Sequence, residues 1–294
     1  FTSEELAMYV GHCTINPLAH LPFNPDELPE AKTSENVLVV GGGVAGLQAA
    51  ITAADRGHKV TIVEKSDKLG GLLWFTDVDV DKPDLRNFKN LLIREVNKRD
   101  IEVKLNTEVD EAFIKAIAPQ HIIIATGAVP SCPPIPGIEK AHQSLEAYKG
   151  NVVPGKKVVM VGGGLIGAEQ GLFLAKTGHD VTVVEMLPRV ANEAYGMYRE
   201  ALAREMAKEN MTLLENTRCL EIGENFVKVL LPDGSEKTLE ANTVLHALGM
   251  KSRSTEALKA AAGDIPVTVI GDAIAPGKVD QATRGGYMAA IEIA

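Results

Sequence analysis

A direct repeat constrains this chain more than any other feature. Residues 37–64 and residues 158–185 align without a gap at a constant offset of 121, and 13 of the 28 positions are identical. Each copy has a β-branched apolar run, a glycine turn, a helical stretch and a second apolar run that ends in Glu. This order is typical of a βαβ unit. The 294 residues are therefore expected to form two α/β domains built on one plan.

The glycine turns follow the spacing G-x-G-x-x-G and then a small residue. In this pattern the first glycine makes a tight turn, the second admits a pyrophosphate to the backbone, and the third lets the helix pack closely. The following helix N-terminus favours an anion. Glu64 and Glu185 each lie 23 residues after the first glycine, where a carboxylate can accept hydrogen bonds from ribose hydroxyls. The pattern residues are Gly41, Gly43, Gly46 and Ala50 in the first copy, and Gly162, Gly164, Gly167 and Gly171 in the second.

Composition excludes several other classes of protein. With 30 Lys and Arg against 39 Asp and Glu, the net charge is −9, which argues against a nucleic-acid surface. The hydrophobic fraction of 45% argues against disorder. Residues 37–54 are uncharged, but four glycines interrupt them, so a strand, turn and helix are expected instead of a membrane span. Three cysteines without a Cys-x-x-Cys pair indicate a reducing, cytoplasmic setting. The chain starts at Phe1 without a signal pattern, so we expect a fragment or a processed chain.

Two later motifs complete a resemblance to a known family. Ala125-Thr126-Gly127 closes the first copy, and Gly271-Asp272 follows an apolar run near the end of the chain. With the two fingerprints, they resemble the flavoproteins with two dinucleotide-binding domains, in which an NAD(P)H domain is inserted into an FAD domain. The resemblance implies an α/β fold of two Rossmann-like domains. Each domain would have three layers in the order ββα, that is, two β layers and one layer of helices. The implied divisions are a lead-in (1–34), a discontinuous FAD domain (35–150 plus 255–294) and an NAD(P)H domain (151–254).

The resemblance also implies which residues hold the cofactors. The carboxylate of the late Gly-Asp turn would bond the FAD ribityl chain. The last helix, over 277–290, would face the flavin and stabilise negative charge on it. The implied FAD residues are Gly41, Gly43, Ala45, Gly46, Glu64, Lys65, Gly70, Gly71, Leu72, Val109, Ala125, Thr126, Gly127, Gly271, Asp272 and Ala282. The implied NAD residues are Gly162, Gly164, Leu165, Ile166, Gly167, Glu185 and Gly249. Glu185 favours NADH because a carboxylate repels a 2′-phosphate, and Arg189 nearby weakens that preference.

The positions of the cysteines narrow the branch of the family. Disulfide reductases of this architecture carry a redox Cys pair soon after the first Glu, and residues 65–98 contain no Cys. Residues 69–106 instead resemble the reductase part of 2,4-dienoyl-CoA reductase, enoate reductases and trimethylamine dehydrogenase. Residues 8–20, MYVGHCTINPLAH, resemble the run that supplies the last thiolate of a [4Fe–4S] cluster in those enzymes. Cys13 is thus a possible cluster ligand, and the alternative is a small buried apolar residue. The other ligands and an FMN-bearing barrel would lie upstream, in the same polypeptide or in a partner subunit.

The resemblance implies an NAD(P)H-oxidising flavin oxidoreductase. Electrons would pass from FAD to the cluster, to FMN and then to an enoate or dienoyl-type alkene, which would be reduced. Alternatively, the enzyme would oxidise an amine. No catalytic acid or base is expected, because the hydride chemistry belongs to the cofactors. Two alternatives stay open: a free-standing NADH-dependent reductase that serves a protein acceptor, and a non-catalytic module that binds FAD or ADP.

The remaining patterns have plainer interpretations. Residue pair Asp233-Gly234 lies between two alternating runs and predicts a β-hairpin. His58 and His179 match across the repeat and are expected to be turn residues. The acidic residues after the first fingerprint lack the glycine and the terminal Glu of a calcium loop, so a solvated loop is expected. These acidic residues are Asp77, Asp79, Asp81 and Asp84.

Overall fold

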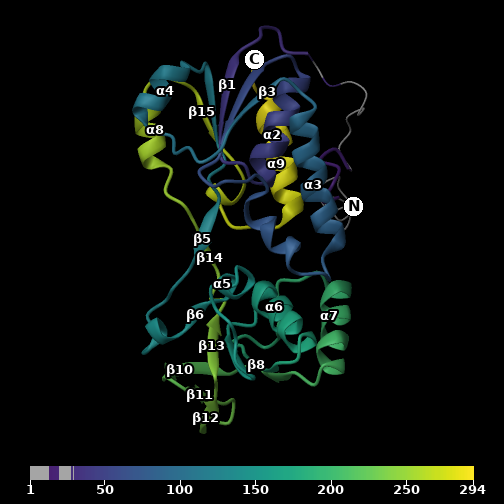
Figure 1. Ribbon diagram of the computed structural model, residues 1–294, viewed down its shortest axis with the longest axis vertical. Coiled ribbons are helices and arrows are strands. Elements are labelled where there is room, and N and C mark those ends of the chain that lie inside the picture. The colour runs from purple at the N-terminus through teal and green to yellow at the C-terminus, as the bar shows by residue number, and fades with distance from the viewer. Residues whose placement is uncertain (1–12, 20–27, 29) are drawn as a thin grey trace, which may run out of the picture. The chain divides into compact units, whose positions relative to one another are not determined.

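The computed structural model describes residues 13–19, 28 and 30–294, so most of the lead-in expected over 1–34 lies outside the described residues. The chain forms two compact units (Figure 1). Unit 1 joins Phe1–Val129 to Lys251–Ala294, and unit 2 is Pro130–Met250. Unit 1 is therefore discontinuous. The first boundary precedes the one expected after residue 150, because strand β6 (His142–Gln143) pairs with a strand of unit 2.

Unit 1 is built on a five-stranded parallel sheet. In sheet order its strands are β15 (Val267–Val269), β4 (His121–Ile124), β1 (Asn36–Val40), β2 (Lys59–Val63) and β3 (Ile101–Lys104). Because both faces of such a sheet are covered, its strands are nearly continuous apolar runs, as HIII in β4 illustrates. The late strand β15 pairs with β4 as an edge strand, which returns the end of the chain to the first domain.

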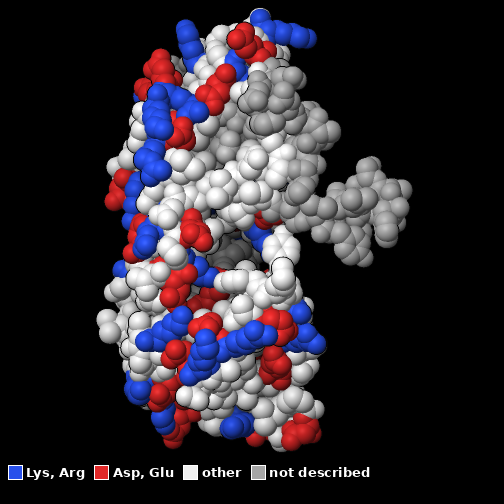
Figure 2. All heavy atoms as spheres, turned by 90° about the vertical axis from the view of Figure 1, so that its right-hand side faces the viewer, with Lys and Arg blue, Asp and Glu red and all other residues white. Residues whose placement is uncertain are grey.

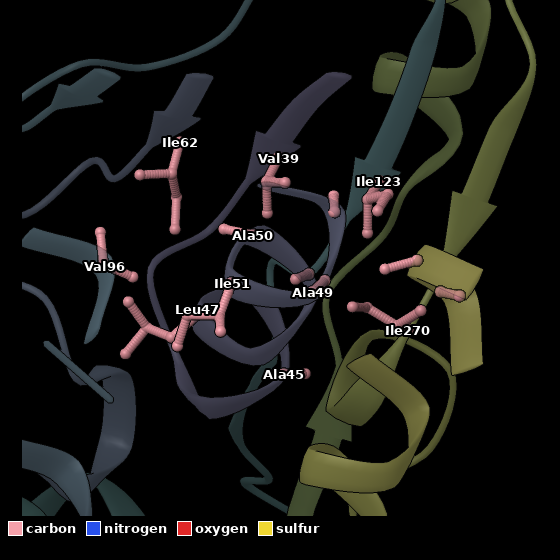
Figure 3. Packing of buried hydrophobic residues seen from close by; sticks show 14 of the residues in the cluster. Val39, Ala45, Leu47, Ala49, Ala50, Ile51, Ile62, Val96, Ile123 and Ile270 are labelled. Atoms are coloured by element: carbon pink, nitrogen blue, oxygen red, sulfur yellow. The ribbon is translucent and has the colours of Figure 1, made fainter. Parts of the chain in front are cut away.

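Helices cover both faces of this sheet. One face carries α2 (Val44–Asp55), α3 (Pro83–Asn97) and α9 (Val279–Ile291). Figure 3 shows strand residues Val39, Ile62 and Ile123 pointing toward α2, whose Leu47 and Ala49 are fully buried. The small residues of α2 let it lie close to the sheet and to α9. The other face carries α4 (Glu111–Ile117) and α8 (Glu256–Ala262).

Unit 2 repeats this plan. Its parallel strands, in sheet order, are β6, β13 (Thr243–His246), β7 (Lys157–Val161), β8 (Asp180–Val184) and β9 (Thr212–Leu214). One face packs against α6 (Leu165–Lys176) and α7 (Gly196–Lys208), and α5 (Ser144–Tyr148) lies beside α6. The other face packs against an antiparallel sheet of β10 (Arg218–Ile222), β11 (Phe226–Leu230) and β12 (Glu236–Glu240). The hairpin expected at Asp233-Gly234 joins β11 to β12 and is confirmed.

The α/β fold class is confirmed, and the layers differ between the units. Unit 2 has the expected third layer of β-strands, whereas in unit 1 the short helices α4 and α8 cover the corresponding face. The repeat predicted from the sequence is confirmed in the secondary structure. Strand β7, helix α6 and strand β8 begin and end 121 residues after β1, α2 and β2. The segments that cross between the units, β5 (Ala128–Pro130) and β14 (Met250–Ser252), pair as a two-stranded sheet. The short 3₁₀ helices among the described residues are η1 (Gly71–Asp77), η2 (Ile138–Lys140) and η3 (Gly271–Ala273).

The surface mixes charges of both signs. On the face in Figure 2, Lys and Arg lie among Asp and Glu. Several of these charges are paired, such as Arg99 with Asp55 at 2.6 Å and Lys98 with Glu95 at 2.7 Å. Exposed pairs of this kind contribute little stability. In the part of the chain that the structure describes, no helix is long and apolar enough to cross a membrane.

Candidate dinucleotide-binding sites

The first glycine turn lies directly against the end of β4. Gly41 has φ +114° and donates its N–H to Val63 O at 2.8 Å. A Cβ at Gly41 would lie 2.3 Å from Ala125 O, and a Cβ at Gly46 would lie 1.9 Å from Gly41 O. Both contacts are with backbone atoms, which cannot move aside independently. The turn therefore requires glycine at both positions.

The N-terminus of α2 is suited to an anion. Its N-cap is Gly43, which offers no side chain to the first amides, and the first turn contains no acidic residue. The nearest atom to a Cβ at Gly43 would be Gly71 Cα at 3.8 Å, so this side of the turn is open. Close by, Thr126 Oγ1 is buried and has no hydrogen-bond partner within the described residues. An exogenous group with phosphate or hydroxyl oxygens would satisfy both features.

Glu64 ties the fingerprint to the loop that follows β2. Its Oε2 accepts from Gly42 N at 2.8 Å, and its Oε1 accepts from Ser66 N at 2.8 Å and from Ser66 Oγ at 2.9 Å. The carboxylate that the sequence assigns to a ribose thus also fixes the glycine turn. Each carboxylate oxygen has two lone pairs, so Oε2, which among the described residues accepts only from Gly42 N, can still accept a bond from a hydroxyl.

The late Gly-Asp turn meets the first fingerprint. Gly271 has φ +60°, and its added Cβ would lie 2.8 Å from Ala45 Cβ. Asp272 Oδ1 accepts from Gly277 N at 2.9 Å, and burial raises the pKa of Asp272. The turn, the edge strand β15 and α9 border a pocket of about 400 Å³, which Ala282 also lines. Residues more than 200 positions apart in the sequence therefore meet in unit 1.

The other residues assigned to FAD lie in two groups. Gly70 donates its N–H to Gly42 O at 2.8 Å, and a Cβ at Gly71 would lie 2.7 Å from Gly43 Cα, so this loop packs on the fingerprint. Leu72, directly after this loop, and Lys65, before it, are both exposed at the surface. By contrast, Val109 packs with the apolar cluster between the sheet and helices α4 and α8. Gly127 has φ +73° and begins the crossing to unit 2.

The second fingerprint repeats the backbone contacts of the first. Gly162 has φ +98°, and its Cβ would lie 2.4 Å from Ala247 O. A Cβ at Gly167 would lie 2.0 Å from Gly162 O. Glu185, only 6% exposed, accepts from Gly163 N and from Leu187 N at 2.7 Å each. The other residues assigned to NAD are Gly164, Leu165 and Ile166 at the start of α6, and Gly249, which has φ +90°.

The backbone donors that hold the two carboxylates were not predicted from the sequence. Gly42 and Gly163 are the middle glycines of their turns, and each gives its N–H to the Glu that ends the next strand. The signal was available, because both residues match across the repeat. His58 and His179, which correspond across the repeat, each lie between a turn and the following strand, as expected. Glu35 N–H donates to His58 Nδ1 at 3.2 Å, and His179 Nδ1 bonds Gly155 O at 2.8 Å.

The expectation of a solvated acidic loop is wrong at Asp79. Its side chain is buried, and its Oδ1 accepts from Asp81 N at 3.0 Å, because the chain folds back there at the end of η1. Asp77 forms an ion pair with the buried Lys89. Asp84 lies in the first turn of α3, where an acidic side chain suits the helix dipole. Within the described residues, no group of three or more metal-binding side chains is present.

Cys13 is exposed at the start of the described lead-in. Asn16 donates its N–H to the Cys13 sulfur at 3.4 Å, and Leu18 donates its N–H to Asn16 Oδ1 at 2.9 Å. Thr283 of α9 donates to Thr14 O at 3.0 Å, so this short segment lies on unit 1. The alternative of a small buried apolar residue does not fit an exposed thiol.

Comparison with known proteins identifies the family. The family model described as pyridine nucleotide-disulphide oxidoreductase matches residues 35–272. The chain belongs to this family. An NADH oxidase from Thermoanaerobacter brockii is 35% identical over 289 residues, which are 96% of this chain and 44% of the relative. A cinnamate reductase from Clostridium sporogenes is 36% identical over 178 residues, which are 59% of this chain and 26% of the relative.

A solved structure gives the same result. The 2-naphthoyl-CoA reductase in complex with 2-naphthoyl-CoA matches with a TM-score of 0.90 and 33% identity, over 96% of this chain and 43% of that chain. These matches confirm the resemblance to the FAD- and NAD(P)H-binding part of enoate-reductase-like enzymes, and the enzyme class of NAD(P)H-dependent flavin oxidoreductase. Family membership implies FAD and NAD(P)H as cofactors. The chain spans less than half the length of these relatives.

Proposed function

We propose that this chain is the electron-entry part of a larger oxidoreductase, in which unit 1 holds FAD and unit 2 binds NADH. The observation that carries the proposal is the paired construction of the sites. Both units have the same glycine turn and the same Glu-to-glycine tether, and the late Asp272 turn packs on the first of them. When both cofactors are bound, NADH supplies a hydride and FAD accepts it, so two electrons enter the protein together.

In unit 1 the amides at the start of α2 would hold the FAD phosphates. Thr126 Oγ1, buried without a partner among the described residues, would bond to the same cofactor. Asp272 would accept from ribityl hydroxyls, because Gly277 N uses one acceptor site of its carboxylate and leaves the others. Burial raises the pKa of Asp272, and donation from cofactor hydroxyls would lower it again by stabilising the charged form. The N-terminus of α9 would favour extra negative charge on the bound group.

In unit 2 the position of Glu185 supports NADH over NADPH. Its carboxylate accepts two backbone N–H groups and is 6% exposed, so it is held at the end of β8. There it would accept from the ribose hydroxyls of NADH. A 2′-phosphate would bring negative charge against the same carboxylate, and the exposed Arg189 would offset only part of that repulsion.

We also propose that electrons leave through a [4Fe–4S] cluster with Cys13 as one thiolate ligand. The thiol is exposed, and the Asn16 N–H donates to its sulfur, which stabilises a ligating thiolate. Such a cluster needs four thiolates, and Cys132 and Cys219 lie in unit 2. The remaining ligands and an FMN-binding barrel would belong to the same polypeptide or to a partner subunit. Two electrons and two protons would then reduce an enoate or dienoyl-type alkene, or the module would serve amine oxidation.

Anaerobic titration with NADH tests the entry step. We expect one equivalent of NADH to remove the visible absorbance of oxidised flavin from the purified FAD-bound protein, and NADPH to do so at higher concentration. Gly167→Ala places a Cβ 2.0 Å from Gly162 O, so this variant should lose reduction by NADH and still be bleached by dithionite. Gly196→Ala, whose Cβ meets nothing within 4 Å, is the matched control. A flavin that dithionite bleaches and NADH does not would refute the proposal in favour of a non-catalytic module.

A further inference from the structure

We propose that Glu193 is an internal competitor of the dinucleotide phosphate in unit 2, and that it sets the affinity for NADH. This inference rests on the proposed function of the second fingerprint. It concerns a carboxylate that occupies the end of α6 where the pyrophosphate would bind.

The repeat continues beyond its sequence match into the loop that carries Glu193. At the same offset of 121, Gly70 corresponds to Ala191, and both residues have positive φ, +112° and +51°. Gly70 donates its N–H to Gly42 O at 2.8 Å, and Ala191 donates its N–H to Gly163 O at 2.7 Å. The two loops therefore pack on their fingerprints in the same way, although their sequences differ.

The copies diverge two residues later. In unit 1 this position is Leu72, a side chain that is 38% exposed. In unit 2 it is Glu193, whose Oε1 accepts from Leu165 N at 2.5 Å. A Cβ at Gly164 would lie 3.0 Å from the same oxygen. The carboxylate thus covers the N-cap and the first amide of α6, whereas the nearest atom to a Cβ at the corresponding Gly43 is 3.8 Å away.

A carboxylate and a phosphate make the same demand on a helix N-terminus. Both accept from its first amides and both are favoured by its dipole, so the two cannot use the Leu165 N–H at once. Glu193 is exposed, so it can rotate into solvent when a phosphate arrives. Each binding event must replace an existing charge-assisted hydrogen bond, and the displaced carboxylate then lies near a dianionic pyrophosphate. Both effects weaken dinucleotide binding.

The open N-terminus of α2 and the covered N-terminus of α6 suit the different times for which FAD and NADH would stay bound. FAD stays bound through many turnovers, and no carboxylate occupies the corresponding place at α2 in the described structure. NADH must bind and NAD⁺ must leave in every turnover. An internal competitor of moderate strength speeds release without touching the reacting atoms.

Binding of NAD⁺ and of inorganic pyrophosphate tests the proposal, because neither reduces the flavin. We would measure both dissociation constants by calorimetry on the FAD-bound protein, for wild type, Glu193→Gln and Glu193→Leu. Glu193→Leu installs the residue found in unit 1, and we expect it to bind NAD⁺ about tenfold more tightly, a difference of about 1.4 kcal/mol. Glu193→Gln should be intermediate. Pyrophosphate affinity should rise in parallel, and the limiting rate of flavin reduction at saturating NADH should not change.

Glu200→Gln is the matched control, because it removes one exposed negative charge from α7 of the same unit and should leave both constants unchanged. Equal or weaker NAD⁺ binding by Glu193→Leu, with a normal far-UV spectrum, would overturn the inference while NADH bleaching of the flavin still upholds the function of the site. A gain in pyrophosphate affinity without NAD⁺ binding in any variant would support the competition at α6 and refute NADH as the ligand.

Discussion

The contact between α2 and α9 yields the sharpest prediction. Substitutions at two adjacent glycines of α9 separate the effect of helix propensity from the effect of a steric clash with α2. A Cβ at Gly286 would lie 2.3 Å from Ala45 O and 3.1 Å from Ala49 N, both backbone atoms of α2. At Gly285 the nearest atom would be Gly271 N at 4.0 Å. Replacing either glycine by alanine gains about 1 kcal/mol of helix propensity. Only at Gly286 must the two helices move apart, which costs about 1–3 kcal/mol or more.

The difference between Gly285→Ala and Gly286→Ala therefore isolates the steric cost. We expect Gly285→Ala to raise the free energy of unfolding by up to about 1 kcal/mol, and Gly286→Ala to lie about 1–3 kcal/mol or more below it. Urea unfolding of the flavin-free protein, followed by far-UV circular dichroism, measures both. Gly286→Ala should also retain less FAD, because Ala45 lies beside the Gly271 turn. Equal stability of the two variants would refute the close approach of α2 and α9.

Three further predictions concern titrating and reactive groups. Burial lowers the pKa of His246 in the folded protein below the ordinary value of 6.5 that it has in the unfolded chain. At a pH between the folded and the unfolded pKa, the unfolded chain therefore binds a proton that the folded protein does not. The free energy of unfolding should fall as the pH drops below about 6.5, and His246→Phe should reduce that slope in urea unfolding; an unchanged slope would contradict the assignment. Asp77→Asn leaves the ammonium of Lys89, whose side chain is 5% exposed, without its partner and should cost about 1–3 kcal/mol, whereas Lys89→Met should cost less in the same assay. Burial raises the pKa of Cys219 to about 11, so iodoacetamide at mildly alkaline pH should label the exposed Cys132 before Cys219, as peptide mass spectrometry would record.

The elements of the repeat were predictable because local and tertiary demands agree there. The uncharged run over 37–54 becomes β1, a glycine turn and α2, and its counterpart becomes β7 and α6. Glycines at Gly41 and Gly46 are required by backbone contacts that any such turn makes, so their spacing identifies the turn without knowledge of the rest. The late Gly271-Asp272 motif similarly indicated that the end of the chain returns to the first domain.

Features that depend on contacts between distant segments were not predictable. The third layer of unit 1 consists of α4 and α8, because Ile114 and Ala262 pack on the sheet face formed by Leu38 and Ile122. Strand β6 has two residues, too few for any periodic pattern, and its pairing with β13 moves the first domain boundary. The short range of the sequence match also concealed the loop of Glu193, since its backbone follows the repeat after the residues have diverged.

The tethered carboxylates change how variants of these sites must be interpreted. Glu64 and Glu185 are assigned to ribose, and each also accepts the N–H of the middle glycine of its own turn. A substitution at either residue therefore removes a possible ligand contact and loosens the turn that presents the helix N-terminus. The loss is greater at Glu185, which is buried, so its glycine N–H would be left without an acceptor away from water. Loss of cofactor affinity in such a variant combines both effects, and a stability measurement on the cofactor-free protein is needed to separate them.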